Sequence, residues 1–173
     1  LKALEQDSMR ALVIDLRDNP GGYLHEAVAM ADEFLTEGQN IVTTRYRNGE
    51  EHTSKAYSGE RYEDLPVHIL INENSASASE VFTGALQDHD RAVVYGKTSY
   101  GKGLVQEDKY LGDGSKVRLT VAYYYTPSGR SIQKPYKEGE PANEGVFLSD
   151  SGRVLATAGG IEPDVELAND STS

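Results

Sequence analysis

The stretch that decides the fold is Ala11-Leu-Val-Ile-Asp-Leu16, a short apolar run that leads directly into Arg17-Asp-Asn-Pro-Gly-Gly22. A continuous apolar run of this length, bounded by polar residues, is typical of a strand that is buried on both faces. After the glycine turn, apolar residues recur at helical spacing from Leu24 to Leu35. Strand, glycine turn and helix therefore follow one another directly, which indicates an α/β protein.

The same succession occurs a second time further along the chain. Val67 to Ile71 has the pattern of a second buried strand, a turn of small residues follows, and a helix is predicted over residues 79–88. Strands are also predicted over residues 91–95 and 116–125. Repeated strand-helix units imply a mostly parallel sheet with helices packed on it.

A hairpin is predicted around Asn48-Gly49, a dipeptide that strongly favours a two-residue turn. The flanking segments, residues 41–47 and 51–57, are polar, so we expect an exposed ribbon that projects from the core. In the last quarter of the chain only residues 145–148 and 154–158 are strand-like. That part is expected to form loop-rich structure at the edge of the fold.

Composition limits the classes of protein to which this chain can belong. The 173 residues suit one domain, and the absence of Cys excludes disulfides and thiolate metal sites. The formal charge of −11 disfavours a nucleic-acid partner, because phosphates repel an acidic surface. No apolar stretch approaches the roughly 20 residues that a membrane helix needs. The chain begins at Leu1 within a helix-like segment and without an initiator Met, so we expect a piece of a longer protein.

Candidate nucleophiles gather at Ser75, Ser77 and Ser79, at the start of the predicted 79–88 helix. Unpaired N–H groups and a partial positive charge at a helix N-terminus stabilise an oxyanion, so a hydroxyl placed there is suited to nucleophilic catalysis. The structural alternative is a helix cap, in which Ser77 or Ser79 caps the helix and Glu80 completes a capping box. Taken alone, these residues favour the cap.

Lys102 is the candidate base, because burial disfavours the charged form of a lysine and a neutral amine can accept a proton. It lies between Gly101 and Gly103, which allow the backbone to approach another element closely. Gln106 follows four residues later, a spacing that places both side chains on one face of a strand or a helix. Its neutral amide can orient the amine there. The structural alternative is a surface lysine in a flexible turn.

A third candidate is Asn19-Pro-Gly-Gly22, whose two glycines can direct backbone N–H groups into a cleft ahead of the predicted helix. Its alternative is an ordinary strand-to-helix turn. Asp15 and Arg17 are expected to form a structural ion pair without a catalytic role. The four His, at positions 25, 52, 68 and 89, have no ligand or triad spacing and are expected to be structural or solvated. The serines, Lys102, Gln106 and the glycines together supply the groups that acyl transfer requires.

Four motifs, spread along the chain from the first strand to residue 133, also carry a resemblance to a known family. They are Leu16-Arg-Asp-Asn-Pro-Gly-Gly22, Asn74-Ser-Ala-Ser-Ala-Ser-Glu80, Ser99-Tyr-Gly-Lys-Gly-Leu-Val-Gln106 and Tyr125-Thr-Pro-Ser-Gly-Arg-Ser-Ile-Gln133. Gly160-Ile-Glu-Pro-Asp-Val165 is similar to the closing motif of the same family. In sequence and order they resemble the carboxyl-terminal processing, or tail-specific, proteases. The resemblance runs over nearly the whole chain and implies a serine peptidase with a ClpP/crotonase-like α/β core.

The resemblance also implies roles for individual residues. The family's nucleophile falls on Ser77, its lysine on Lys102 and its assisting glutamine on Gln106. The oxyanion donors would be the N–H of Ala78 and the N–H of either Gly21 or Gly22. No metal or cofactor takes part in the family's reaction.

On the same basis, the substrates are expected to be polypeptides with exposed, often apolar C-termini, which are cut near that end through an acyl-enzyme. Family members usually carry a PDZ domain before the core, which binds the substrate's C-terminus by strand addition. We therefore expect an excised catalytic core without this domain and without the start of the core. Bacterial members act outside the cytoplasm, in the periplasm or cell envelope. Oligomerisation of the longer protein is left open.

Two alternatives stay open on the sequence. One is a catalytically silent ligand- or peptide-binding module of the same fold. The other is a Ser-Lys amidase that acts on cell-wall peptides. The joint presence of Ser77, Lys102 and Gln106 argues against the binding module.

Overall fold

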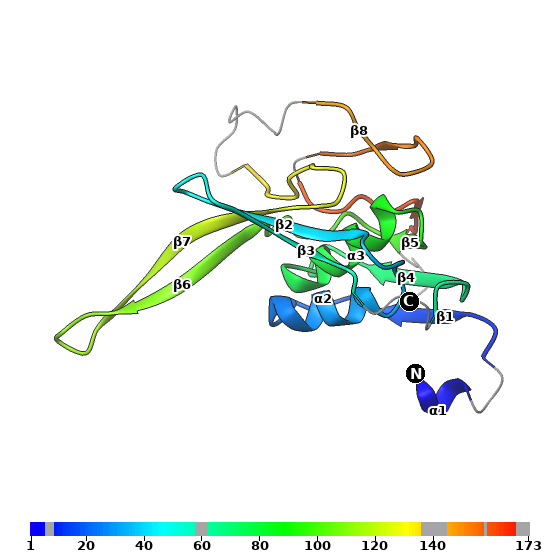
Figure 1. The fold of residues 1–173 in the computed structure, drawn as a ribbon, viewed down its shortest axis with the longest axis horizontal. Helices are drawn as coiled ribbons and strands as arrows, with labels where there is room; N and C mark the ends of the chain where they lie inside the picture. The colour runs from blue at the N-terminus through cyan, green and yellow to red at the C-terminus, as the bar shows by residue number, and fades with distance from the viewer. Residues whose placement is uncertain (6–8, 58–61, 136–144, 158, 169–173) are drawn as a thin grey trace.

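The computed structural model describes residues 1–5, 9–57, 62–135, 145–157 and 159–168. Figure 1 shows how its elements are arranged. In chain order they are α1 (Lys2–Glu5), β1 (Leu12–Asp15), α2 (Leu24–Asp32), β2 (Asn40–Tyr46), β3 (Glu51–Lys55), β4 (Val67–Ile71), α3 (Ala78–Asp88), β5 (Ala92–Gly96), β6 (Leu104–Tyr110), β7 (Lys116–Tyr125), β8 (Phe147–Leu148), β9 (Val154–Leu155) and β10 (Val165–Glu166).

The first sheet consists of parallel strands in the order β1-β4-β5-β10. Leu12 pairs with Val67, which in turn pairs with Ala92, so three strands begin at the same level. The parallel sheet expected from the two strand-helix units is confirmed. Strand β10 was not predicted, because it consists of only two residues, which is too short to show an alternating or apolar pattern.

The helices cover one face of this sheet. Val67, Ile69 and Ile71 of β4 point into the core and are at most 3% exposed, whereas Val13 of β1 is 60% exposed. The expectation that the 11–16 strand is buried on both faces is therefore wrong. Alternate side chains of β1, those of Val13 and Asp15, face away from the helices and are exposed.

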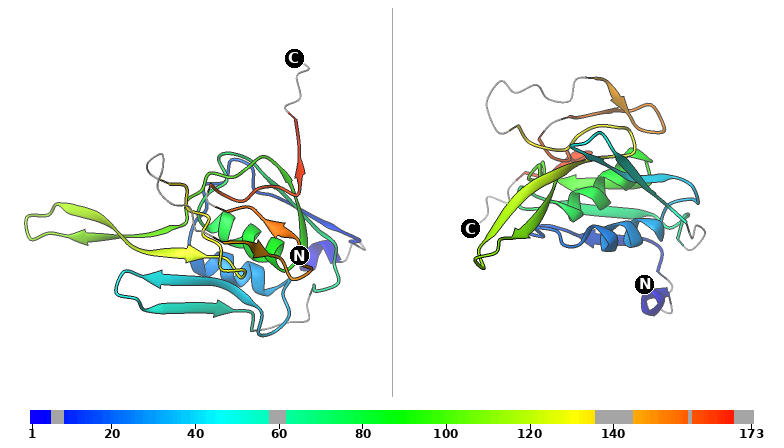
Figure 2. Two further views of the ribbon diagram at one scale, coloured as in Figure 1. Left: turned by 90° about the horizontal axis from the view of Figure 1, so that it is seen from above. Right: turned by 60° about the vertical axis from the view of Figure 1, so that its left-hand side comes forward.

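The second sheet is antiparallel, with the order β3-β2-β7-β6. The hairpin predicted at Asn48-Gly49 is confirmed as the turn between β2 and β3. Its outer half, residues 45–52, is exposed as the polar flanks indicated, whereas Ile41 and Val42 at the start of β2 are buried in the core. The ribbon that projects furthest is the β6–β7 hairpin, called the arm below (Figures 1 and 2).

Helix α3 lies between the two sheets, and each residue from Ala78 to Asp88 is buried. It contacts β5 of the parallel sheet, β2 of the antiparallel sheet, and α2. At its C-terminal end, Asp88 forms an ion pair of 2.8 Å with Arg130, and both side chains are 1% exposed. The helix begins one residue before the predicted 79–88 span. Its position is thus fixed from several sides.

The expected loop-rich edge is confirmed for the part of the last quarter that the structure describes. There β8 and β9 form a short antiparallel pair, and residue 158 of the predicted 154–158 strand lies outside the described residues. The predicted helical start is α1, which ends at Glu5. Helix α2 ends at Asp32, three residues before the predicted limit at Leu35.

Candidate functional site

Ser77 lies at the turn between β4 and α3, and its backbone has φ 58° and ψ −119°. A positive φ is unusual for a residue other than glycine and costs about 1–3 kcal/mol, so it persists only where the surroundings enforce it. The small neighbours Ala76 and Ala78 give room for the sharp turn. A serine on a strained strand-to-helix turn has the arrangement of a nucleophile elbow. Local sequence patterns do not predict this conformation.

The hydroxyls of the other two candidate serines are already occupied. Ser75 is fully buried, and its Oγ donates to the carbonyl of Leu16 at 2.7 Å. Ser79 is 5% exposed, and its Oγ donates to the carbonyl of Asn19 at 3.2 Å. Ser77, in contrast, is half-buried and lines a cavity. The structure therefore distinguishes Ser77 from its neighbours.

The helix cap that was the structural alternative is also present. Ser77 is the N-cap of α3 and forms a capping box with Glu80. The N–H of Ser77 donates to Glu80 Oε2 at 2.8 Å. In a capping box the serine oxygen accepts a hydrogen bond and keeps its own proton. The cap is therefore compatible with a nucleophilic role for Ser77.

Glu80 does more than complete the cap, because its carboxylate is 1% exposed and accepts hydrogen bonds from two parts of the site. Oε1 accepts from Ser99 Oγ at 2.5 Å and from the N–H of Gly101 at 2.7 Å. Oε2 accepts from the N–H of Lys102 at 2.8 Å in addition to that of Ser77. One buried carboxylate thus joins the Ser77 turn to the Lys102 loop. The Ser-x-x-Glu spacing was a signal for the cap, but it does not reveal the second connection.

Two backbone amides near Ser77 are available to a ligand. A Cβ on Gly21, where φ is +90°, would lie 2.5 Å from the carbonyl of Ala76 and 2.7 Å from the N–H nitrogen of Ala78, so only glycine fits. The N–H of Gly21 donates to Asn19 Oδ1 at 2.9 Å. Within the described chain, neither Gly22 nor Ala78 donates its N–H to a hydrogen-bond acceptor. The Asn19-Pro-Gly-Gly22 turn thus packs directly against the Ser77 turn.

Lys102 and Ser77 line the same cavity, of about 370 Å³, called the Ser77 cavity below. Its walls are formed by Gly22, Ser77, Lys102, Leu104, Val105, Gln106, Asp108, Arg118 and Tyr124. Lys102 is half-buried, and among the described residues no carboxylate forms an ion pair with its amine. No hydrogen bond joins Ser77 Oγ to Lys102 Nζ among the described contacts. Lys102 is therefore not the exposed surface lysine of the alternative interpretation.

Gln106 lies in the Ser77 cavity together with Lys102, but the spacing argument is not the reason. Lys102 precedes β6, and the pairing of β6 with β7 shifts register between Val105 and Gln106. A four-residue spacing across such a bulge does not preserve a common face. The close approach that Gly101 and Gly103 were expected to allow is confirmed, since a Cβ on Gly103 would lie 2.8 Å from the backbone nitrogen of Gln133.

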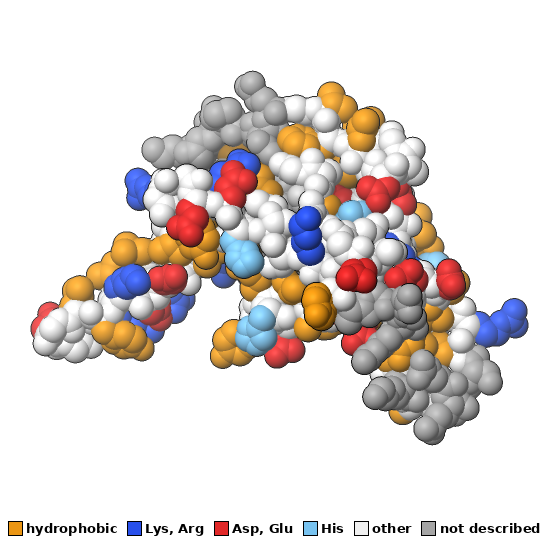
Figure 3. Space-filling view, viewed as in Figure 1, with side chains coloured by type: hydrophobic (Ala, Val, Ile, Leu, Met, Phe, Trp, Pro, Cys, Tyr) orange, Lys and Arg blue, Asp and Glu red, His pale blue; other side chains and the backbone are white. Residues whose placement is uncertain are grey.

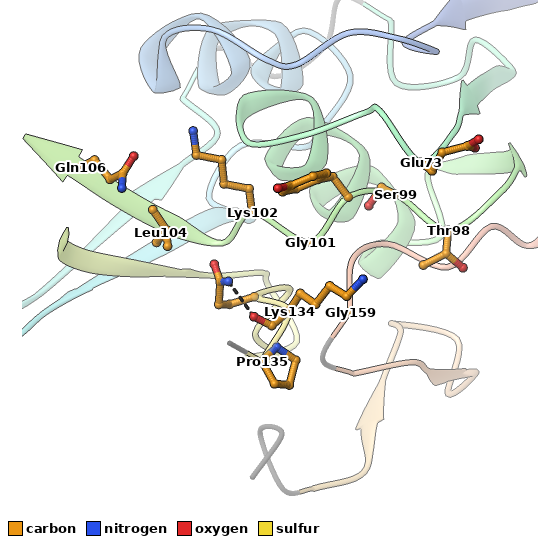
Figure 4. Close-up of a pocket in the computed structure, with 12 residues that line it drawn as sticks. Glu73, Thr98, Ser99, Gly101, Lys102, Leu104, Gln106, Lys134, Pro135 and Gly159 are labelled. Carbon is orange, nitrogen blue, oxygen red and sulfur yellow. Dashed lines mark hydrogen bonds between the residues drawn. The ribbon is translucent and has the colours of Figure 1, made fainter. Parts of the chain in front are cut away.

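Two further cavities adjoin this one. The larger, of about 580 Å³, lies along the loop from Thr98 to Lys102 and shares Lys102 and Gln106 with the Ser77 cavity. The side chains of Lys102 and Lys134 both line this larger cavity and extend in different directions (Figure 4). The smaller, of about 270 Å³, lies beside Gly22 and Ala78. Most of its wall is apolar and comes from Leu16, Ala27, Met30 and Phe82.

The two charged side chains that the arm contributes to the Ser77 cavity, Asp108 and Arg118, are paired with each other. Asp108 is held by Arg118 and Lys116, and the hydrogen bonds from Arg118 and then Lys116 lower the pKa of its carboxyl. Burial raises the pKa of the Tyr124 phenol, which therefore stays neutral. The ion pair expected between Asp15 and Arg17 is confirmed at 2.7 Å, and it lowers the pKa of Asp15. No histidine of the described chain lines the Ser77 cavity.

Comparison with known proteins gives this arrangement a family. The sequence profile described as Peptidase family S41 matches residues 1–140. The chain belongs to peptidase family S41. The resemblance drawn from the four motifs is thereby confirmed, and so is the expectation of a serine-type peptidase at the level of the family.

Similar S41 proteins include a carboxy-terminal-processing protease of Bartonella bacilliformis, 46% identical over 127 residues, which are 73% of this chain and 29% of that protein. A probable CtpA-like serine protease of Staphylococcus haemolyticus is 46% identical over 129 residues, 73% of this chain and 26% of that protein. The chain thus spans less than a third of the length of these relatives.

Among solved structures, the photosystem II D1 C-terminal processing protease superposes with a TM-score of 0.76 at 31% identity, over 97% of this chain and 37% of that chain. Mature CPAF superposes with a TM-score of 0.60 at 16% identity, over 91% of this chain and 39% of that chain, a likeness of fold alone. The expected α/β fold class is confirmed. In the described part of the chain, no helix is long and apolar enough to cross a membrane.

Proposed function

We infer that this S41 chain is the catalytic core of a serine endopeptidase that cleaves polypeptides near their C-termini, with Ser77 as nucleophile and Lys102 as general base. The observation that carries the inference is the strained turn at Ser77, which opens into the cavity that Lys102 also lines. Relatives named as carboxy-terminal-processing and serine proteases support the reaction class.

In the first step, the neutral amine of Lys102 accepts the proton of the Ser77 hydroxyl while Oγ attacks a peptide carbonyl. Gln106, in the same cavity, orients the amine through its neutral amide and adds no charge that would hold a proton on it. Lys102 then gives the proton to the leaving amine. Water, activated by the same lysine, hydrolyses the acyl-enzyme and restores Ser77.

The oxyanion that forms in each step is stabilised by the N–H groups of Ala78 and Gly22. Between the two glycines that the sequence left open, Gly22 is the better candidate, because the N–H of Gly21 already donates to Asn19. Ala78 is the first residue of α3, where the helix dipole adds to the stabilisation of a negative charge. Removal of one such donor costs about 2.7–4 kcal/mol of barrier in well-studied enzymes.

The smaller cavity beside these amides receives an apolar side chain of the substrate. It borders Gly22 and Ala78, and its wall is formed by Leu16, Ala27 and Phe82 among others. A side chain next to the scissile carbonyl would enter it when the oxyanion lies against the amides. This is in keeping with substrates whose C-terminal segments are apolar.

The wider setting is part of the same proposal. The longer protein carries a PDZ domain before this core, acts outside the cytoplasm in the bacterial envelope, and needs no metal or cofactor. The small share of the relatives' length that the chain spans, 29% and 26%, is in keeping with further domains.

The test is the turnover of tailed protein substrates by the full-length protein and its Ser77→Ala and Lys102→Ala variants. Each variant is expected to lose kcat by at least about 10³-fold, and a fluorophosphonate probe should label the parent but not Ser77→Ala. Lys134→Ala is the matched control, since Lys134 is an exposed lysine that points away from Lys102. Turnover at the parent rate in either dyad variant would refute the assignment. Cleavage of short cell-wall peptides in preference to tailed proteins would instead favour the amidase.

A further inference from the structure

The arm presents one polar face to the Ser77 cavity. Gln106 pairs with Thr120, and Asp108 pairs with Arg118, in the antiparallel register of β6 and β7. Side chains two apart on a strand share a face, so Asp108 and Arg118 continue the wall that begins with Gln106. Both residues line the cavity that contains Ser77. The proposed catalytic groups and this charged pair therefore belong to one continuous site.

Three side chains on this face form a fixed charge cluster. Arg118 donates to both oxygens of Asp108, from Nε at 2.7 Å and from Nη2 at 3.2 Å. Lys116 donates to the same carboxylate at 2.8 Å. Two cations thus share one anion, which leaves a formal charge of +1. Arg118 keeps three N–H groups that Asp108 does not use, and its side chain is 61% exposed.

The sign of this cluster is opposite to that of the whole chain, which has a formal charge of −11. A local positive charge in an acidic protein attracts an anion to one place, while the rest of the surface repels it. Figure 3 shows basic and acidic side chains gathered along the arm. The contrast favours an anionic group of the ligand at this end of the cavity.

Strand geometry gives the distance along the arm between Gln106 and the charge cluster. Asp108 is two residues beyond Gln106, which corresponds to about 6.5–7 Å along β6. An extended peptide advances by nearly the same distance in two residues. Ser77, Gln106 and Arg118 line one cavity. A substrate whose scissile carbonyl lies at Ser77 and which extends along the arm would therefore bring a residue a few positions away from the bond to Arg118.

We propose that Arg118, held by Asp108 and flanked by Lys116, is a specificity-determining residue that binds a carboxylate of the substrate a few residues from the scissile bond. The carboxylate belongs either to an Asp or Glu side chain or to the C-terminus of the polypeptide. This inference rests on the proposed function, because it places the substrate along the cavity that contains Ser77. It adds a preference that the proposed reaction by itself does not imply.

The test compares kcat/KM for peptides that differ by one carboxylate. One series places Glu or Gln at successive positions on each side of the cleaved bond, and a second series has a free or an amidated C-terminus. The full-length parent is expected to prefer the carboxylate at one position by about three- to five-fold at low salt, which is typical of a partly exposed ion pair. The series in which the preference occurs identifies its source.

Three variants make the test specific. Arg118→Gln should reduce the preference to nearly one, whereas Asp108→Asn, which raises the formal charge of the cluster to +2, should increase it. Lys109→Gln is the matched control. Like Arg118→Gln it removes one positive charge from the arm, but the Lys109 side chain lies on the face of β6 opposite to Asp108 and pairs with Glu107. It should keep the parent's preference. An unchanged preference in Arg118→Gln would overturn the inference.

The same peptides, bound to Ser77→Ala and followed by fluorescence anisotropy, separate the two claims. If no variant cleaves any peptide, the proposed function fails, but the ratio of Kd values still reports on Arg118. A carboxylate-to-amide ratio that Arg118→Gln lowers in binding supports the carboxylate site. A ratio that it leaves unchanged refutes the site even if cleavage proceeds.

Discussion

Replacement of Glu80 by Gln tests whether one buried carboxylate aligns the two halves of the site. Four donors converge on it, two from the Lys102 loop backbone, one from Ser99 and one from Ser77. Glutamine has nearly the same shape but offers one oxygen and one NH2 group. The NH2 group cannot accept, so the donors that faced the replaced oxygen lose their partner.

The less damaging orientation places the NH2 group where Oε1 was. The Ser99 hydroxyl, which already accepts from the N–H of Ile161, can then accept instead of donate. Its own O–H and the buried N–H of Gly101 both lose the carboxylate oxygen as acceptor. One buried unsatisfied donor costs about 1–3 kcal/mol. The N–H groups of Ser77 and Lys102 bond more weakly to a neutral amide oxygen than to a carboxylate, which adds to this cost. Relief of a buried charge offsets part of it. For a chain of this size the expected fall in Tm is about 2–4 °C for each kcal/mol.

Activity should fall further than stability does. The same Oε2 accepts from the N–H of Ser77 and from that of Lys102, so a shift of the amide moves the nucleophile relative to the base. Misplacement of reacting groups by about 1 Å can cost on the order of 10²-fold. We expect kcat/KM of Glu80→Gln to decrease by about that factor, measured well below the Tm of the variant.

The control for general destabilisation is Thr83→Val. Thr83 is fully buried one turn further along α3, and its hydroxyl donates only to the carbonyl of Ser79 at 2.8 Å. It should lower the Tm by a similar amount and leave kcat/KM within about three-fold of the parent. Equal losses of activity in the two variants, or parent-like activity in Glu80→Gln, would refute the alignment role.

Two further predictions concern the turn and the arm. Gly21→Ala should lower kcat/KM by on the order of 10²-fold, because its Cβ would crowd the N–H of Ala78. Gly38→Ala is the control, because φ is +88° there and nothing lies within 4 Å of the added Cβ. It should lose only the stability that a positive φ costs, about 1–2 kcal/mol, and keep its activity. Normal activity of Gly21→Ala would contradict the argument. Asp108→Asn should lower the protection of the arm amides in hydrogen exchange. The pKa of Asp108 is lowered by Arg118 and Lys116, so its contribution is complete above about pH 4 and disappears as the pH falls further. A parent-variant difference that already declines between pH 8 and 5 would refute this.

The sequence predicts the strand-helix units well, because their signals are local. An apolar run such as 67–71, a turn of small residues and a helical repeat are all found within about 20 residues. Ser77, Lys102 and Gln106 emerge in the same way, from short motifs, and they line one cavity. The parallel sheet follows from the repetition of the unit.

What the sequence does not predict depends on pairing between distant segments. β6 was not expected, since Glu107, Asp108 and Lys109 interrupt any apolar pattern, and it forms only because β7 supplies its partner. The full extent of the arm, and with it the Asp108–Arg118 contact, depends on that register. The second role of Glu80 depends on a loop 19 to 22 residues away in sequence. No local pattern encodes such contacts.

The strained turn at Ser77 persists because helix α3, which follows it, is fixed in position. A positive φ at serine would relax if α3 could slide or turn by a few degrees, because the strain of about 1–3 kcal/mol is small. At the N-terminal end, Glu80 is bound to the Lys102 loop, and at the C-terminal end Asp88 is paired with Arg130 at 1% exposure. Breaking a buried ion pair by loss of one partner costs about 3–5 kcal/mol, more than relaxation of the turn would recover. The contacts at the two ends of α3 therefore stabilise its position by more than the free energy that relaxation of the Ser77 turn would release. Ser77 consequently stays directed into the cavity.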